Sequence, residues 1–316
     1  METKTYELAA GLNGRISKIN AYNGGIPFGR YDTFRRETLK HGDTIENVLL
    51  AEAREQAYDA KTPATADDPI GVVVATQEIA STSYGITIDP ATIDWVTADD
   101  PEAQMLEDAF IETLYRGRNK SVDAAVRKVI RPDAAATGQW GALSNARFQT
   151  TIDITMSNGI PSGGVGGEDA ALAMINAIKS AAAKMRAGYN VTNTASDGSG
   201  HTITTRAERV VMIMHSATRA YLDVYGYSGR PNPTAADYGV DEIIIDDDIE
   251  LTNNNSTDMA YAYLVDARAI GLYLKRESVR TKEIEGCDNM QVFLHYRIQY
   301  NDASKLFAVW ECNGVS

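Results

Sequence analysis

Residues 168–187 have the sequence EDAALAMINAIKSAAAKMRA and predict a long amphipathic helix in a chain otherwise rich in strand-like segments. Two acids open this stretch, Lys184 and Arg186 close it, and Gly188 follows, which is the order of charges and capping that stabilises a helix. The apolar residues recur at the three- and four-residue spacing of one helix face: Leu172, Ile175, Ile178, Ala182 and Met185. We therefore expect a helix over 168–187 with these side chains on its buried face.

Strand-like stretches lie on both sides of this helix. Before it, 148–156 places Ile152 and Ile154 on one face, and after it, 209–215 contains five consecutive apolar residues, as buried strands do. Residues 217–225 are predicted to be helical. Further strands are predicted at 242–245, 259–266, 270–275, 290–298 and 306–310. This succession predicts a mixed α+β protein with no βαβ repeat.

The N-terminal half is predicted to begin with an extended arm. Residues 1–40 combine scattered glycines with many large apolar groups, which favours an arm that docks on another surface over a frayed end. A first helix is predicted over 45–58, because Asp43 and Glu46 have the spacing of a capping box.

Two strands follow, at 71–76 and 84–89, and we expect them to pair as a hairpin closed by Ser81-Thr82-Ser83. Asp99 and Asp100 then precede Pro101, which is a favourable helix start. A long helix is therefore predicted over 101–131, roughly 45 Å in length and interrupted near Gly117. The polar stretch 192–199 is predicted to be a surface loop.

Length and charge exclude several classes of protein. The chain has 316 residues, 44% of them hydrophobic, and a formal net charge of −13, which indicates a folded acidic protein of roughly one to three domains. Such acidity argues against a chain that grips nucleic acid through its overall surface, because phosphate binding needs clustered Lys and Arg. No apolar run approaches the roughly 18–20 residues of a membrane span, and the start Met1-Glu2-Thr3-Lys4 predicts no secretion.

Several residue groups could in principle carry chemistry. The glycine loop 162–167 precedes a helix, but neither of the usual phosphate-binding patterns is complete, and two acids stand where a phosphate would bind. The acidic run 241–250 offers oxygen ligands for a divalent cation, yet it lacks the spacing of a calcium loop, so a solvated turn is favoured.

The remaining candidates lack a catalytic pattern. The histidines and serines are not arranged in a metal motif or a nucleophile elbow, and the two cysteines form no metal or disulfide pattern. These residues are His41, His201, His215, His295, Ser144, Ser162, Ser216, Cys287 and Cys312. We expect no catalytic, cofactor-binding or metal-binding residues and no enzymatic activity.

The order of these elements resembles the major capsid (head) protein of tailed bacteriophages, which has the Hong Kong 97-like fold. The resemblance covers nearly the whole chain. Local phrases also carry it: FRRETLKHGDTIE at 34–46, VVMIMH at 210–215 followed by RAYLDVY at 219–225, the acidic stretch 241–248, YLVDAR at 263–268, and the segments 289–300 and 305–310.

The resemblance implies an α+β subunit with a fixed set of parts. These are an N-terminal arm (1–43), an extended β-hairpin loop with an entry helix (44–98), a peripheral domain (99–190 and 276–316) that includes the spine helix (101–131), and an axial domain (191–275). It implies no cofactor and no membrane association.

The resemblance also implies a function. The chain would self-assemble into pentamers and hexamers that form the icosahedral head, and would enclose double-stranded phage DNA without sequence-specific binding. An acidic inner surface would repel the packaged DNA. The protein would be assembled in the host bacterial cytoplasm and located in the virion, with scaffolding, portal and decoration proteins as candidate partners. Two alternatives stay open: an encapsulin-like nanocompartment shell protein, and a divalent-cation-dependent enzyme or binding module that uses the acids of 241–250.

Overall fold

The computed structural model describes residues 29–31, 34–38, 44–50, 72–78, 82–88, most of 113–130, 147–162, 167–194, 200–226, 233–251, 258–283, 290–302 and 307–315. The chain divides into two compact units, which we call the first and the second unit. The first comprises Met1–Thr44, Glu78–Val126 and Gly271–Tyr300, and the second comprises Ile45–Gln77, Arg127–Ile270 and Asn301–Ser316. The boundary between 190 and 191 that the resemblance implies does not coincide with a boundary between these units.

The second unit is built on a six-stranded sheet of order β10-β9-β11-β14-β5-β6. Its strands are β10 (Glu242–Ile245), β9 (Val210–Met214), β11 (Asp258–Asp266), β14 (Val309–Val315), β5 (Arg147–Ser157) and β6 (Ile160–Pro161). Two neighbouring pairs, β10 with β9 and β14 with β5, are parallel, and the other three are antiparallel. Helix α6 (Ser216–Tyr225) connects β9 to the parallel strand β10, so the described residues contain one βαβ unit without a repeat of it.

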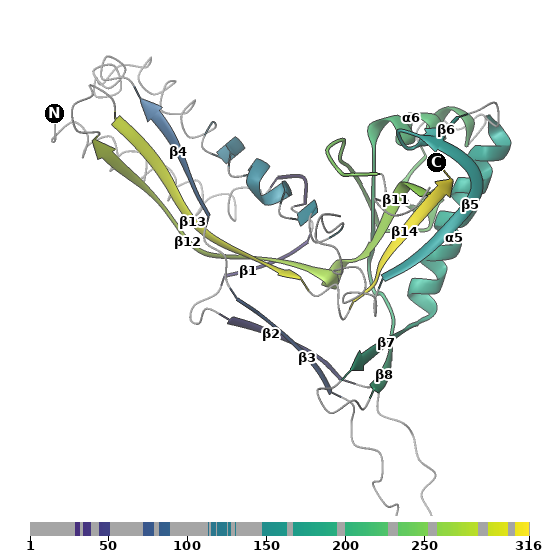
Figure 1. Ribbon diagram of the computed structural model, residues 1–316, viewed down its shortest axis with the longest axis horizontal. Coiled ribbons are helices and arrows are strands. Elements are labelled where there is room, and N and C mark those ends of the chain that lie inside the picture. Colours follow the sequence, from purple (N-terminus) through teal and green to yellow (C-terminus); the bar gives the residue numbers. More distant parts are fainter. Residues whose placement is uncertain are drawn as a thin grey trace, which may run out of the picture. The chain divides into compact units, whose positions relative to one another are not determined.

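Helix α5 (Glu168–Ala187) covers one face of this sheet, as Figure 1 shows, and has the predicted bounds. Its side chains Met174, Ile178 and Met185 are fully buried in one core with alternate residues of β9 and β11, among them Met212 and Leu264. This alternation follows from the two-residue period of a strand, which sends every second side chain to the same face. The core therefore lies between α5 and the sheet.

Leu172 is not part of that core, which corrects the prediction. Its side chain is 52% exposed, whereas the other four residues of the predicted face are buried. At 100° per residue, Leu172 points roughly 100° away from the mean direction of those four side chains. Leu172 is three residues before Ile175, as the helical period requires, but its side chain points to the border of the buried face.

The first unit contains a four-stranded sheet of order β1-β12-β13-β4. Its strands are β1 (Arg35–Thr38), β12 (Ile270–Glu283), β13 (Met290–Asp302) and β4 (Thr82–Ile88). β1 pairs with β12 in parallel, and β13 pairs with β4 antiparallel. The two long strands β12 and β13 begin where the sequence predicted strands and continue past the predicted ends.

The described residues between 113 and 130 are all helical, which confirms the second half of the helix predicted over 101–131; residues 101–112 lie outside the described residues. The predicted interruption at Gly117 is wrong, because Gly117 and the described residues after it, up to Ile130, are helical. The Ser121 hydroxyl donates a hydrogen bond to the carbonyl oxygen of Gly117, at 3.2 Å, one helical turn back. A single glycine lowers helix stability by only about 1 kcal/mol and does not by itself end a helix.

Two further predictions are corrected in the N-terminal half. Residues 45–50 are not helical but belong to β2 (Thr44–Leu50), which pairs with β3 (Val72–Glu78) in a two-stranded sheet. The β-branched residues Thr44, Ile45 and Val48 favour a strand there, and the capping-box spacing was coincidental. β3 and β4 are strands as predicted, but they belong to different sheets, so the predicted hairpin between them is wrong.

The polar stretch 192–199 is also only partly a loop. Residues up to 194 belong to β7 (Tyr189–Thr194), which pairs antiparallel with β8 (Gly200–Thr205). The last predicted strand, 306–310, is observed as β14 at 309–315, where the polar residues Glu311 and Asn313 are nevertheless buried. None of the helices in the described part of the chain is long and apolar enough to cross a membrane.

Candidate functional site

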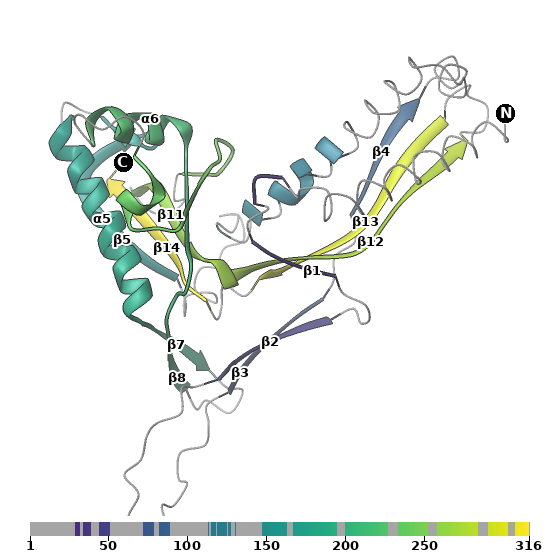
Figure 2. The same cartoon turned by 180° about the vertical axis from the view of Figure 1, so that it is seen from behind.

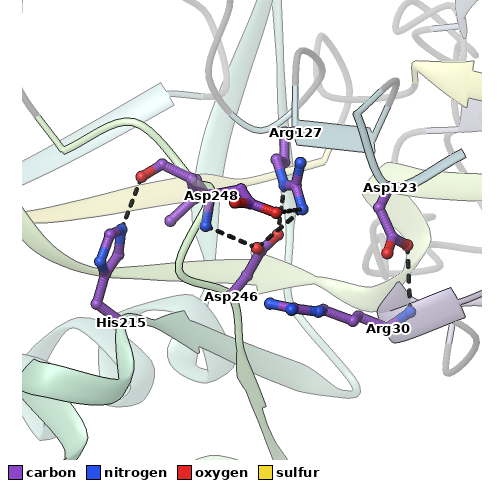
Figure 3. Close-up of polar contacts among 7 residues, drawn as sticks. Arg30, Asp123, Arg127, His215, Asp246 and Asp248 are labelled. Carbon is purple, nitrogen blue, oxygen red and sulfur yellow. Dashed lines mark hydrogen bonds and ion pairs between the residues drawn. The ribbon is translucent and has the colours of Figure 1, made fainter. Parts of the chain in front are cut away.

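The acidic run after β10 forms a turn in which the central carboxylates have defined partners, as Figure 3 shows. Asp246 is fully buried and accepts two hydrogen bonds from Arg127, from Nε at 2.6 Å and from Nη2 at 3.0 Å. Nη2 of Arg127 also donates to Asp248, at 2.7 Å, and the backbone N–H of Asp248 donates to Asp246, at 3.1 Å. We call Arg127, Asp246 and Asp248 the Arg127 cluster. A two-point Arg–carboxylate contact is among the stronger polar interactions of proteins.

The third acid of the turn stabilises a helix. Asp247 accepts a hydrogen bond from the backbone N–H of Ser216, the first residue of α6, at 2.7 Å. A carboxylate at this end satisfies a helix N–H group and faces the positive end of the helix dipole. His215, just before α6, lies with Nε2 2.7 Å from the carbonyl oxygen of Ile249 (Figure 3). Because a carbonyl oxygen only accepts, Nε2 carries the proton in this contact.

The acidic turn therefore has a structural role in this chain. Its carboxylates accept hydrogen bonds from Arg127 and from the start of α6. Across the residues that the structure describes, no group of three or more His, Cys, Asp or Glu side chains could hold a metal ion. The prediction of a solvated turn is wrong for Asp246, which is buried, and holds for Asp247 and Asp248, which are exposed.

The first unit contains a second carboxylate with a defined role. Asp123, 7% exposed, accepts a hydrogen bond from the backbone N–H of Arg30, at 3.1 Å (Figure 3). Tyr31 and Phe34, which follow Arg30 closely in the sequence, are almost completely buried, with ring centroids 6.1 Å apart. This part of the predicted arm is thus packed; residues 1–28 lie outside the described residues.

Gly29 makes this packing possible, and replacing it with alanine is expected to loosen it. Its backbone has φ +82°, and a β-carbon there would lie 2.5 Å from Oδ1 of Asp123. Strain and displacement of the carboxylate together cost about 1–3 kcal/mol, so we expect the Arg30 amide to exchange its hydrogen roughly 5- to 150-fold faster in Gly29→Ala.

Hydrogen exchange measured by NMR or mass spectrometry tests this prediction. Gly239→Ala is the matched control, because Gly239 also has a positive φ, of +72°, but has only the Lys179 side chain near its β-carbon position, at 3.8 Å. An unchanged Arg30 exchange rate in Gly29→Ala would contradict the role given to this contact.

A third polar cluster connects the end of β11 with the start of β7. The carboxylate of Asp266, fully buried, accepts hydrogen bonds from the Tyr189 hydroxyl at 2.9 Å and from Nη2 of Arg268 at 2.8 Å. The backbone N–H of Ala308 donates to the same hydroxyl, at 3.0 Å. Burial, with the charge of Asp266 beside it, raises the pKa of Tyr189. These bonds fix the base of the β7–β8 hairpin.

The remaining predicted candidates have structural surroundings. The backbone N–H of Gly167, at the start of α5, donates to the hydroxyl of Tyr221, at 2.9 Å, so a tyrosine stands where an anion would bind. Ser162 donates weakly to the carbonyl of Thr155, at 3.5 Å. Cys312 is a buried free thiol. Ser144, Cys287 and the side chains of His41, His201 and His295 lie outside the described residues.

Three buried groups predict that the stability of the second unit falls at alkaline pH. Burial raises the pKa of the Cys312 thiol and of the Tyr189 and Tyr261 hydroxyls, so each group stays protonated in the folded chain. Unfolding exposes them with ordinary values of about 8.5 for Cys and about 10 for Tyr. Above those values only the unfolded chain loses protons, so the stability decreases by about 1.4 kcal/mol per pH unit and group.

Urea unfolding between pH 8 and pH 11 measures this decrease. Tyr261→Phe removes a hydroxyl that has no hydrogen-bond partner and is expected to flatten the slope above pH 10 by the contribution of one group. Tyr225→Phe makes the same substitution at a side chain that is 43% exposed and serves as the control. Equal slopes for wild type and Tyr261→Phe would contradict the assignment.

Sequence reasoning identified the acidic run but not its partner. Arg127 lies 119 residues before Asp246, within a helix whose pattern shows an ordinary amphipathic segment. The available signal was that consecutive acids after a buried strand cannot all face solvent, since side chains alternate along a strand. That signal calls for a cation near Asp246, but not for any particular one.

The profile of one protein family, described as Phi29-like phage major capsid protein, matches residues 28–301. No curated protein matches the chain. Among solved structures, the capsid of Staphylococcus phage Andhra is similar with a TM-score of 0.55 and 11% identity, over 92% of this chain and 86% of that chain. Mycobacterium phage Bobi is similar with a TM-score of 0.52 and 14% identity, over 94% of each chain. The capsid of cyanophage P-SCSP1u is similar with a TM-score of 0.51 and 13% identity, over 90% and 87%.

Proposed function

Because the chain belongs to the family of Phi29-like phage major capsid proteins, we propose that it assembles into pentamers and hexamers forming an icosahedral head around double-stranded phage DNA. Membership of that family makes it a structural protein of the virion capsid shell. The family profile, which spans most of the chain, is the observation that carries the proposal. The fold is the Hong Kong 97-like fold of phage capsid proteins that the resemblance implied.

The arrangement of strands supports a role that depends on neighbouring subunits. Among the described residues, the pairs β2–β3 and β7–β8 each form a two-stranded sheet of their own. An isolated two-stranded sheet is at best marginally stable in water, so such pairs gain from packing against other surfaces. In a shell, adjacent copies of the chain supply those surfaces.

The division into arm, extended loop, peripheral domain and axial domain is part of the proposal. The pair β2–β3 lies within the range 44–98 that we assign to the extended loop. The range 191–275, assigned to the axial domain, contains β9, α6, β10 and β11. Helix α5, from the range assigned to the peripheral domain, shares one core with them.

The net charge of −13 supports enclosure of DNA without binding to it. A protein that holds DNA neutralises phosphates with clustered Lys and Arg, whereas an acidic inner surface repels the packaged duplex. In this proposal the shell is assembled in the host cytoplasm, and scaffolding, portal and decoration proteins are its further partners.

Both alternatives have less support. An encapsulin-like compartment shell would share the fold, but the matched family is one of phage capsid proteins. A cation-dependent enzyme would rely on the acids of 241–250, and the central acids of that run already accept hydrogen bonds from Arg127 and Ser216.

Electron microscopy and sedimentation of the protein test the proposal, with the chain expressed alone and together with the other head proteins of its phage. We expect closed shells, or rings with five and six subunits, and no retention of duplex DNA by the free subunit at physiological salt. Monomers that persist at high concentration under both conditions would contradict it.

A further inference from the structure

Helix α6 turns an apolar face to solvent. Leu222 is buried in the core of the second unit, whereas Val224 is 66% exposed and Tyr225 43% exposed. Ala217 and Ala220 lie seven and four residues before Val224, which is the spacing of one helix face, and both are exposed as well. A solvated helix normally carries charged or polar residues on its outer face, so this face is unusual for a surface helix.

The two charged residues of α6 do not lie in this face. Arg219 and Asp223 form a salt bridge at 2.9 Å. The guanidinium of Arg219 also donates to the carbonyl oxygen of Pro233 and lies over the ring of Tyr238, 5.5 Å from its centroid. Both charges are thereby directed to the side of the helix and leave its exposed face neutral.

Helix α5, which contacts α6, carries a further exposed apolar side chain, Leu172. The two helices meet at two points. The backbone N–H of Gly167 donates a hydrogen bond to the Tyr221 hydroxyl. The side chain of Ile175 packs against Gly226, where an added β-carbon would lie only 2.5 Å from it. Leu172 lies between these two points along α5, and it is 52% exposed. We call the group formed by Leu172, Ala217, Ala220, Val224 and Tyr225 the α6 patch. Figure 2 shows α6 and α5 as neighbouring helices of the second unit.

We propose that the α6 patch is a contact surface for a second copy of this chain; this inference rests on the proposed function as a shell subunit. Exposed apolar patches bordered by polar residues mark sites of protein contact. The patch contains no charged residue, although 23% of the chain is charged. The absence of cations from the patch leaves nothing in it to bind nucleic acid.

Charge favours a copy of the same chain as the occupant. Each copy carries a net charge of −13, so two copies repel wherever acidic surfaces meet. A neutral apolar patch allows two such chains to approach without opposing like charges, and depletion of charge is typical of the centre of protein interfaces. The short side chains of Ala217 and Ala220, on the same helix face as Val224, allow the neighbour to approach closely there.

The size of the patch favours a shell over an isolated dimer. Its exposed apolar area is on the order of a few hundred Å², below the roughly 800 Å² per partner of a stable two-protein complex. In a shell, each subunit meets several neighbours, and small contacts add together. Around a five- or six-fold axis the contact is heterologous, so the patch meets a different surface of the neighbouring copy.

Val224→Asp tests the inference by placing a charge in the patch. Burying an unpaired carboxylate against an apolar surface is strongly unfavourable, so we expect a roughly tenfold or larger loss of assembled particles. Ser180→Asp is the matched control, because it adds the same charge at an exposed position outside the patch. Ser180 is on α5, about 12 Å along the helix from Leu172. Val224→Leu should assemble like wild type. Circular dichroism establishes that each variant is folded.

The outcomes separate this inference from the proposed function. If wild type forms shells and folded Val224→Asp forms as many, the inference is overturned while the shell function stands. If wild type forms no shells at all, the proposed function itself fails. Photo-cross-linking gives an independent test. Shells are assembled from a mixture of isotope-labelled and unlabelled chains that carry a photoreactive amino acid at position 224, and the cross-linked peptides are identified by mass spectrometry. Cross-links between differently labelled copies support the inference, and cross-links to another protein or only within one copy refute it.

Discussion

Arg127→Ala is expected to lower the free energy of unfolding of the second unit by about 3–5 kcal/mol, the largest effect among our predictions. Arg127 supplies two hydrogen bonds to Asp246, whose carboxylate is fully buried. Removing the guanidinium takes a positive charge and two hydrogen bonds from a buried carboxylate, and this penalty exceeds the value of the ion pair itself.

Equilibrium unfolding in urea measures the effect, with Arg186→Ala as the control. Arg186 forms a salt bridge of 2.9 Å with Asp241, but both side chains are about 40% exposed, at 42% and 39%. Solvent screens such a pair, so its loss should cost less than about 1 kcal/mol. The double variant Arg127→Ala/Asp246→Asn removes the buried charge together with its partner and should recover part of the stability. Equal effects of Arg127→Ala and Arg186→Ala would refute the role of the Arg127 cluster.

Ile178→Ala is expected to destabilise the second unit by about 2–5 kcal/mol. The Ile178 side chain is completely buried in the core between α5 and the sheet. Its truncation removes apolar contacts and leaves a cavity that the surrounding side chains fill only in part.

Leu172→Ala is the natural comparison, because it makes a similar truncation on the same helix. Leu172 is 52% exposed, so its replacement should change the free energy of unfolding by less than about 0.5 kcal/mol. Both variants are measured by urea unfolding with circular dichroism. A loss for Leu172→Ala as large as that for Ile178→Ala would contradict the observed orientation of α5 and the exposure of the α6 patch.

Sequence patterns correctly predicted the helices and strands that are determined by neighbouring residues in the chain. The bounds of α5 follow from its acidic start, its basic end and Gly188, all within one short stretch. Strand β9 and helix α6 were found for the same reason, since a run of five apolar residues forms a buried strand and a helical period follows it. The family resemblance then ordered these elements into the correct fold.

The failures concern interactions between distant residues. Neither the pairing of β3 with β2 nor that of β4 with β13 can be read from the sequence between β3 and β4. Strand β14 was misplaced because Glu311 and Asn313 interrupt its apolar pattern, although both are buried. The Arg127 cluster joins residues far apart in sequence, and nothing near Asp246 indicates which cation neutralises it.

The position of β14 has a consequence for how the subunit is made. β14 is the last described strand in sequence, yet it lies between β11 and β5, and the hydrogen-bonded residues Thr150 and Trp310 are 160 positions apart. While the ribosome is still translating, β5 and β11 each have an open edge that only residues 309–315 can fill. Such long-range pairing is slow and leaves aggregation-prone edges exposed. The six-stranded sheet can therefore be completed only after residues 309–315 have been synthesised. A truncated chain without these residues lacks the strand that joins β10-β9-β11 to β5-β6.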